Sequence, residues 1–177
     1  MFAGSVYADN EIYIDQSGDN VNIDLEQLGS SNMIGGLQSV NGSMTAAILT
    51  GGTWTLDINQ IGSSNKFLTD GILGSNFTGF FEFDGDSNDL DFNIDSEYYT
   101  AYIDILGDSN TMTLDKTGYG ASSSDAGYFY LDLNGSSNTI NIEQTSTLAL
   151  DWLKIESDAS NSNICVVQSD GGTSTSC

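Results

Sequence analysis

The sequence predicts an all-β fold, namely a parallel β-solenoid of about six two-strand rungs with a period of about 22 residues plus insertions. Three observations support this fold class. A Gly-x-Ser-Asn tetrapeptide recurs, apolar and polar residues alternate on both sides of it, and turn-forming residues are abundant while proline is absent. The absence of proline suits a fold in which almost every backbone N–H enters a strand ladder.

The tetrapeptide sets the repeat. Successive copies of its Asn lie 22, 33, 23, 22, 28 and 25 residues apart, and the last copy is degenerate. A common length with variable insertions is the signature of a solenoid. The insertions at 35–52 and 118–127 fall on the connections opposite the tetrapeptide, so we expect contact loops on that edge. The predicted repeat-turn residues are Asn10, Gly29, Asn32, Gly62, Asn65, Gly85, Asn88, Gly107, Asn110, Gly135, Asn138 and Asn163.

Alternation around each tetrapeptide predicts two core columns, a column being the equivalent position in successive rungs. Period two indicates half-buried strands, and no 3.6-residue period indicates a helix. Four residues before each Gly, we expect buried Leu25, Ile58, Phe81, Ile103 and Leu131. Two residues after each Asn, we expect buried Ile12, Ile34, Phe67, Leu90, Met112 and Ile140, with Cys165 in the last copy. The acidic residues beside the first column are expected outside: Glu26, Glu82, Asp104 and Asp132, with Lys154 next to Asp132.

The charge of the chain excludes several functions. The net charge is −22, with 25 acidic residues, three lysines and no histidine. Such a surface repels phosphate, which excludes nucleic-acid binding and attraction to anionic lipid, whereas it attracts divalent cations and basic partners. Histidine-based triads and H-E-x-x-H zinc sites are impossible, and we predict no enzymatic activity. No apolar run approaches about 18 residues, so we expect no membrane insertion.

The two ends of the chain predict export. Residues 1–8 end in a small-x-small pattern and resemble the tail of a secretory signal peptide. We expect cleavage after Ala8 and a single domain over 9–177. Cys165 and Cys177 are predicted to form a disulfide, which indicates an extracellular, oxidising compartment, and two free thiols are the alternative. The bridge would cover the C-terminal strand edge and leave the strand at 11–16 open for growth or docking.

One loop imitates a calcium site. Asp84, Asp86, Asn88 and Asp95 take positions 1, 3, 5 and 12 of an EF-hand loop, although Asp89 replaces the required Gly. An ordinary turn in register with the other tetrapeptides is the alternative. We expect that the fold requires no cofactor. Calcium is the ligand that the acidic columns could bind, because stacked carboxylates repel one another and a divalent cation would relieve this repulsion. A second acidic column is expected at Asp15, Asp70, Asp115 and Glu143.

Aromatic residues form a second candidate site. Phe80, Tyr102 and Tyr130 are expected in one outward column, where they could contact a carbohydrate or a cell surface. Stacking of the rings along the sheet without any ligand is the alternative interpretation.

The repeat resembles the curlin repeat of curli subunits, which reads approximately Q-x-G-x-x-N-x-A-x-x-x-Q. The segment from Gln27 to Gln38 matches every position except the Ala, which is Ile34. Partial matches begin at Asn10, Gln60 and Asn138. The resemblance implies an exported subunit, parallel strands in a two-sheet solenoid, and end-to-end stacking into surface fibres.

The chain departs from the curlin pattern at its glutamine columns. These are replaced by Phe83, Ile105 and Leu133, and by Gly71, Ile94 and Lys116. A glutamine ladder favours indefinite stacking, and this chain lacks most of it. A polymer and a capped monomer therefore remain alternative interpretations. We expect a self-associating structural subunit of an extracellular, amyloid-like fibre or biofilm matrix that serves cell adhesion. The alternative is a monomeric secreted or virion-associated adhesin that binds through its loop edge.

Overall fold

The computed structural model describes residues 10–29, 31–36, 45–118, 127–146 and 151–170, and every element in these ranges is a β-strand. Within them there is no helix long and apolar enough to cross a membrane. In chain order the strands are β1 (Glu11–Tyr13), β2 (Asp15–Ser17), β3 (Val21–Leu28), β4 (Met33–Gly35), β5 (Ala47–Thr50), β6 (Thr53–Ile61), β7 (Lys66–Asp84), β8 (Asp89–Leu106), β9 (Thr111–Gly118), β10 (Gly127–Asn134), β11 (Thr139–Ser146), β12 (Asp151–Ser157) and β13 (Asn163–Asp170).

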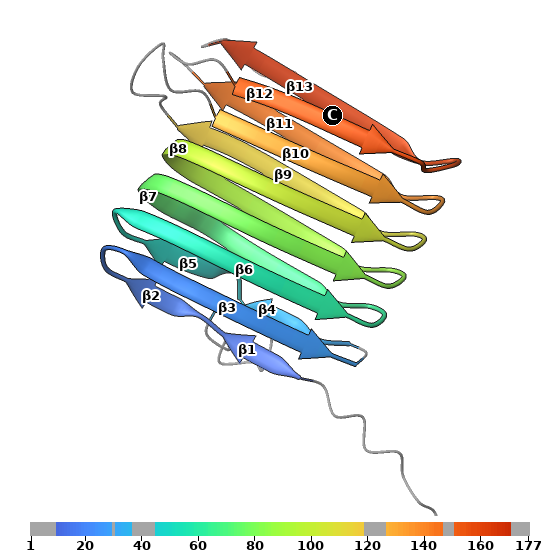
Figure 1. Ribbon diagram of the computed structural model, residues 1–177, viewed down its shortest axis with the longest axis horizontal. Coiled ribbons are helices and arrows are strands. Elements are labelled where there is room, and N and C mark those ends of the chain that lie inside the picture. The colour runs from blue at the N-terminus through green and yellow to red at the C-terminus, as the bar shows by residue number, and fades with distance from the viewer. Residues whose placement is uncertain (1–9, 30, 37–44, 119–126, 147–150, 171–177) are drawn as a thin grey trace, which may run out of the picture.

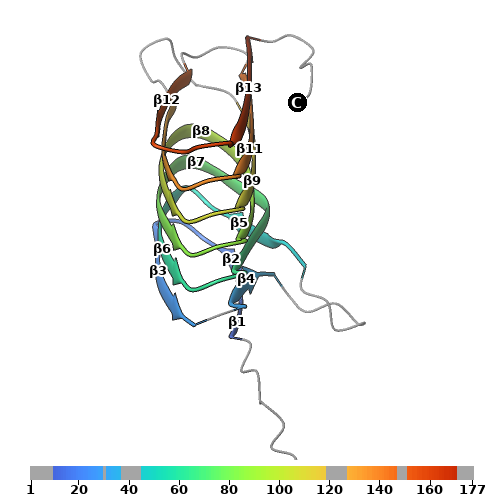
Figure 2. The same cartoon turned by 90° about the vertical axis from the view of Figure 1, so that its right-hand side faces the viewer.

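All strands belong to one 13-stranded sheet in which every pairing is parallel, so the predicted all-β, parallel architecture is confirmed. One path through it runs β1-β4-β7-β8-β9-β11-β13, and β3, β6, β10 and β12 join the second halves of β7 and β8. The sheet curves back on itself and forms two layers. One layer holds the strands of this path with the first halves of β7 and β8, and the other holds β3, β6, β10 and β12 with their second halves (Figures 1 and 2). Short turns join the two layers along one edge.

Two features of the strands differ from the expected pattern. β7 and β8 run for 19 and 18 residues through the bend between the layers, because their pairing with each other continues there from Gly74↔Ser96 to Asn76↔Tyr98. Part of the insertion expected at 35–52 is also strand. β5 pairs with both β2 and β7, and its alternating Ala47 and Leu49 are buried.

The interior is built from the expected columns. In the first, Ile58, Phe81, Ile103 and Leu131 pair in succession and are each 3% exposed or less. In the second, Ile34, Phe67, Leu90, Met112 and Ile140 are 1% exposed or less. Leu25 and Ile12 are only partly buried, because they lie in the first strands of the two layers. Rings of Phe67, Phe81, Phe83 and Phe92 pack together at centroid distances of 4.9–6.5 Å.

The tetrapeptide turns stack through their asparagines. From the third turn on, the buried Asn side chain accepts the backbone N–H of the Asn in the preceding turn: Asn88 Oδ1 lies 2.9 Å from Asn65 N, and Asn110 Oδ1 lies 2.8 Å from Asn88 N. The Asn88 Nδ2 also donates to the Gly85 carbonyl within its own turn, at 3.0 Å. This ladder satisfies backbone groups that would otherwise be buried without partners.

The Gly and Ser of each turn are selected by backbone conformation. Gly85 has a φ of 144°, and a Cβ at this position would lie 1.5 Å from the Gly62 carbonyl oxygen of the preceding turn. The third residue of each turn is left-handed, as at Ser87 with a φ of 61°. Only residues that tolerate these conformations can repeat here.

The last copy of the turn lies one residue earlier than expected, which corrects the assignments of Asn163 and Cys165. Ser162 accepts the Asn138 N–H at 3.0 Å and so takes the ladder position, while Asn163 pairs with Thr139. Ile164 then continues the inner column beside Ile140, and Cys165 pairs with Asn141. The left-handed position is held by Asn161 with a φ of 53°, since Asn tolerates this conformation.

A similar shift affects the column in which Gly71, Ile94 and Lys116 were expected to replace the glutamine of the curlin pattern. A β-bulge between Leu68 and Ile72 inserts one extra residue into β7, so Ile72, and not Gly71, pairs with Ile94. Lys116 follows Ile94 in this column and is buried, with its Nζ 4.6 Å from the centroid of the Tyr99 ring.

Candidate functional site

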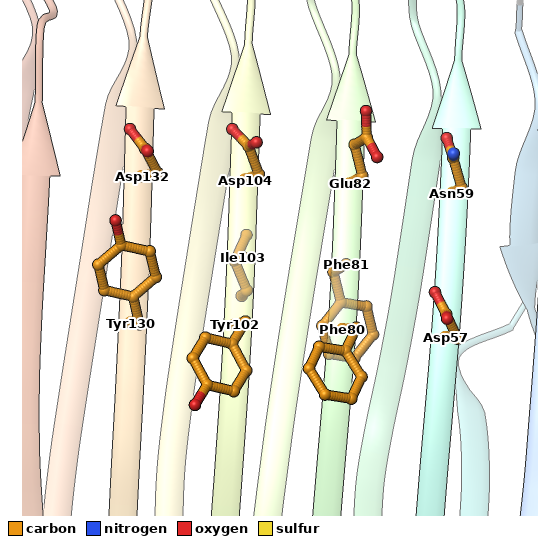
Figure 3. Close-up of a pocket in the computed structure, with 10 residues that line it drawn as sticks. All are labelled: Asp57, Asn59, Phe80, Phe81, Glu82, Tyr102, Ile103, Asp104, Tyr130 and Asp132. Carbon is orange, nitrogen blue, oxygen red and sulfur yellow. The ribbon is translucent and has the colours of Figure 1, made fainter.

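A row of aromatic rings and a row of carboxylates lie side by side on the outer surface of one layer. We call them together the aromatic–acidic strip; it consists of Phe80, Tyr102 and Tyr130 and of Glu82, Asp104 and Asp132. Residues two apart in a strand point to the same side, and the parallel register aligns equivalent residues of β7, β8 and β10. The strip borders a hollow that also includes Asp57 and Asn59 of β6 (Figure 3).

The rings of the strip contact one another and remain accessible. Phe80 and Tyr102 stack with parallel planes at a centroid distance of 5.3 Å, and Tyr102 lies 6.1 Å from Tyr130. Phe80 is 44% exposed and Tyr102 is 38% exposed. Both expectations for these rings therefore fit the geometry, since they stack along the sheet and still present apolar surface to solvent.

The carboxylates of the strip repel one another. Partial burial and the neighbouring charges of Asp132, Glu82 and Asp84 raise the pKa of Asp104 above its ordinary value. The Oδ1 atom of Asp104 is buried and makes no hydrogen bond to the described residues. A donor or cation at this position would stabilise the charged carboxylate.

On β12, the strand next to the strip, a lysine takes the position that an aromatic ring holds on β7, β8 and β10. Lys154 pairs with Tyr130, and Glu156 pairs with Asp132, which corrects the expectation that Lys154 lies beside Asp132. The Lys154 Nζ lies 4.9 Å from the centroid of the Tyr130 ring and 2.7 Å from Glu156 Oε1. The Tyr130 hydroxyl donates to Glu156 at 2.5 Å, and this hydrogen bond raises the pKa of Tyr130 to about 12.

The opposite layer carries a second, less regular acidic group. Asp115 and Glu143 pair directly, but Asn93 precedes them, and Asp15 pairs with Ile48. Partial burial raises the pKa of Asp115, with Glu143 contributing, and burial raises that of Asp91 together with the charges of Asp89, Asp115 and Asp70. Among the described residues, the directly paired acidic members of this column are therefore Asp115 and Glu143.

The four residues of the expected calcium loop do not converge. Asp84, Asp86 and Asn88 lie in one turn, but Asp95 lies about 20 Å along β8, beyond six extended residues. Asn88 Oδ1 is already bound to Asn65 N–H, and Asp86 Oδ1 accepts the Asp108 N–H at 2.7 Å. In the described part of the chain, no three acidic or cysteine side chains gather as a metal site would require. The structure shows the turn alternative.

Both ends of the sheet expose inward-facing apolar residues. At the first end these are Ile12, Ile14, Val21, Ile23 and Leu25, all only partly buried. At the other end, Leu153, Ile155 and Ile164 are partly buried, and Val166 is 39% exposed although it pairs with fully buried Ile142. Cys165 of β13 is disulfide-bonded, while Cys177 lies outside the described residues, as do the expected signal remnant and Gln38.

Comparison with known proteins gave no match to a family model, to a curated protein or to a solved structure.

We expect mild acidification to stabilise the fold. Asp91, Asp104 and Asp115 have pKa values above 3.8 in the folded protein, so the folded state binds protons first as the pH falls. Stability then rises as the pH falls through these raised values, and the gain is complete below the unfolded value. Glu156 acts in the opposite direction, because its pKa is lowered by Lys154. The melting temperature should increase as the pH falls from about 7 toward the ordinary aspartate pKa of about 3.9 at low ionic strength.

Added salt tests the same cause, because it screens the repulsion between exposed carboxylates. High NaCl, or calcium compared with EDTA, should raise the melting temperature at pH 7 and reduce the effect of pH. A melting temperature that falls with acidification and does not respond to salt or calcium would show that these carboxylates do not oppose folding.

Proposed function

We propose that the chain is a β-solenoid of two-strand rungs and that its copies stack end to end as the structural subunit of an extracellular fibre. Three groups of observations support this: the parallel register that repeats along the sheet, end strands that have a single partner among the described residues, and matching columns at the two ends. The last of these carries the proposal.

The end strands offer unused pairing edges. Among the described residues, β1 pairs only with β4, β2 only with β5, and β13 only with β11. An open parallel edge is a template for another strand. Stacking in the register of the molecule would place Ile12 of one copy on Ile164 of the next, and would bury apolar surface that both ends expose.

The polar columns also match at the two ends. Gln16 and Gln168 belong to one column, linked through Leu49, Ile72, Ile94, Lys116 and Gln144. Gln168 Nε2 donates to Gln144 Oε1 at 2.7 Å, and Gln60 donates to Gln27 at the same distance. In the stacked dimer Gln16 would repeat this contact on Gln168, and Asn10 would extend the asparagine ladder beyond Ser162.

Two further observations favour an extracellular fibre. Cys165 is disulfide-bonded, and disulfides persist in oxidising compartments. The resemblance of the tetrapeptide series to the curlin repeat favours a surface filament. The exposed aromatic rings favour a second candidate, a secreted monomeric binding module. In that case the strand edges at both ends would have to be capped.

Two adjacent valines of β13 test the stacking. Val166 faces inward on β13, which has no second partner strand among the described residues. Val167 belongs to the outward column of Asp115 and Glu143. Val166→Lys should abolish assembly because stacking would bury its charge. Val167→Lys, the matched control, should assemble normally. Sedimentation velocity over increasing protein concentration gives the readout, and circular dichroism checks that both variants fold.

Assembly of Val166→Lys at the wild-type concentration would contradict the proposed interface. A wild-type protein that remains monomeric at every concentration would contradict the fibre and favour the monomeric binding module.

A further inference from the structure

We infer that the aromatic–acidic strip is a docking site for a lysine-rich peptide segment of a partner protein. The strip lies on the side of the molecule, on β7, β8 and β10, and not at the ends that the proposed fibre uses (Figures 1 and 3). The inference therefore concerns a different surface and holds for a monomer as well as for a fibre.

The protein already shows the recognition geometry with one of its own lysines. At the end of the strip, the Lys154 ammonium lies over the Tyr130 ring and pairs with Glu156. An ammonium held between a ring face and a carboxylate gains both a cation–π contact and an ion pair. The same two groups recur along the strip, since Asp132 neighbours Tyr102 and Asp104 neighbours Phe80 across adjacent strands.

The remaining positions of the strip lack an internal cation. The chain has three lysines and no arginine. Lys66 pairs with Asp89, Lys154 with Glu156, and buried Lys116 lies over Tyr99. Asp104 Oδ1 is buried without a hydrogen bond to the described residues, and the pKa of this carboxyl is raised by burial and by its acidic neighbours. An external ammonium beside this carboxylate would supply the missing positive charge.

The chemistry of the strip favours a lysine-rich peptide over other ligands. A calcium ion takes six to eight oxygen ligands and gains nothing from aromatic rings, whereas the strip alternates rings with single carboxylates. A neutral sugar could stack on the rings but would leave the carboxylate repulsion in place. From β7 to β10 the strip spans two strand spacings, about 10 Å, which is the length of about three extended residues.

Fluorescence anisotropy with labelled deca-lysine tests the site. The protein carries Val166→Lys, so that assembly through the proposed end contact does not disturb the measurement. Asp104→Asn should weaken binding about fivefold, and Tyr102→Leu should do the same. Asp91→Asn is the matched control, because it removes the same charge from the same strand on the opposite layer, and Tyr13→Leu is the control for the ring. Neither control should change the affinity by more than about twofold.

Three results would overturn the inference. Equal weakening by Asp104→Asn and Asp91→Asn would show attraction to net charge alone. Binding of cellohexaose that Tyr102→Leu abolishes, with deca-lysine insensitive to the strip variants, would assign the strip to neutral polysaccharide. Absence of deca-lysine binding at about 50 mM salt, where screening is weak, would show that the strip binds no such segment.

Discussion

Ile103→Asp should destabilise the fold by about 4 kcal/mol or more, because it places an unpaired carboxylate in the core. Ile103 is 1% exposed and lies in β8 between Phe81 of β7 and Leu131 of β10. Its neighbours in the column are apolar, so no described group there could pair with the charge. Urea unfolding monitored by circular dichroism measures the loss as a decrease in the midpoint.

The adjacent residue supplies the matched control. Asp104→Asn changes a carboxylate on the outer side of the same strand, where the raised pKa of Asp104 reports burial and repulsion. Removing this charge should leave stability unchanged or increase it. A harmless Ile103→Asp, or a severe Asp104→Asn, would mean that the strand faces the other way, since a shift of one residue exchanges the two faces.

Asn88→Ala is expected to cost about 2–4 kcal/mol, the second large effect. The Asn88 side chain accepts the Asn65 N–H and donates to the Gly85 carbonyl, at 2.9 and 3.0 Å. Alanine leaves a backbone donor buried without a partner, and its desolvation is not recovered. Asn163→Ala is the control: Asn163 follows the series in sequence, but its exposed side chain lies outside the ladder.

Thermal unfolding of the two asparagine variants distinguishes the two registers of the last turn. The structure predicts a large fall in melting temperature for Asn88→Ala and almost none for Asn163→Ala. Equal falls would place Asn163 in the ladder and restore the register expected from sequence.

The core was predictable because alternation and the tetrapeptide agree with each other in the central repeats. Ile58, Phe81 and Ile103 fall at one distance from well-preserved turns, so one column follows from counting. The last turn was missed because Gly and Asn are replaced by Ala159 and Ser162. Asn161 was the usable signal, since Asn is one of the few residues that tolerate the left-handed position.

The candidate site was predictable only in part. Outward rings at Phe80, Tyr102 and Tyr130 follow from the alternation. The position of Lys154 over Tyr130 does not, because it depends on the corrected register of β12. The four residues of the expected calcium loop do not come together, because the EF-hand spacing assumes a folded loop, whereas here Asp95 lies far along an extended strand. No residue pattern between Leu68 and Ile72 predicts the bulge before Ile72.

End-to-end stacking through β13 and the first strands is tested most directly by electron microscopy of the purified chain. The account predicts unbranched filaments one molecule wide, with strands perpendicular to the axis and a repeat of about 4.8 Å along it. Discrete rods of about 30 Å at every protein concentration would contradict it.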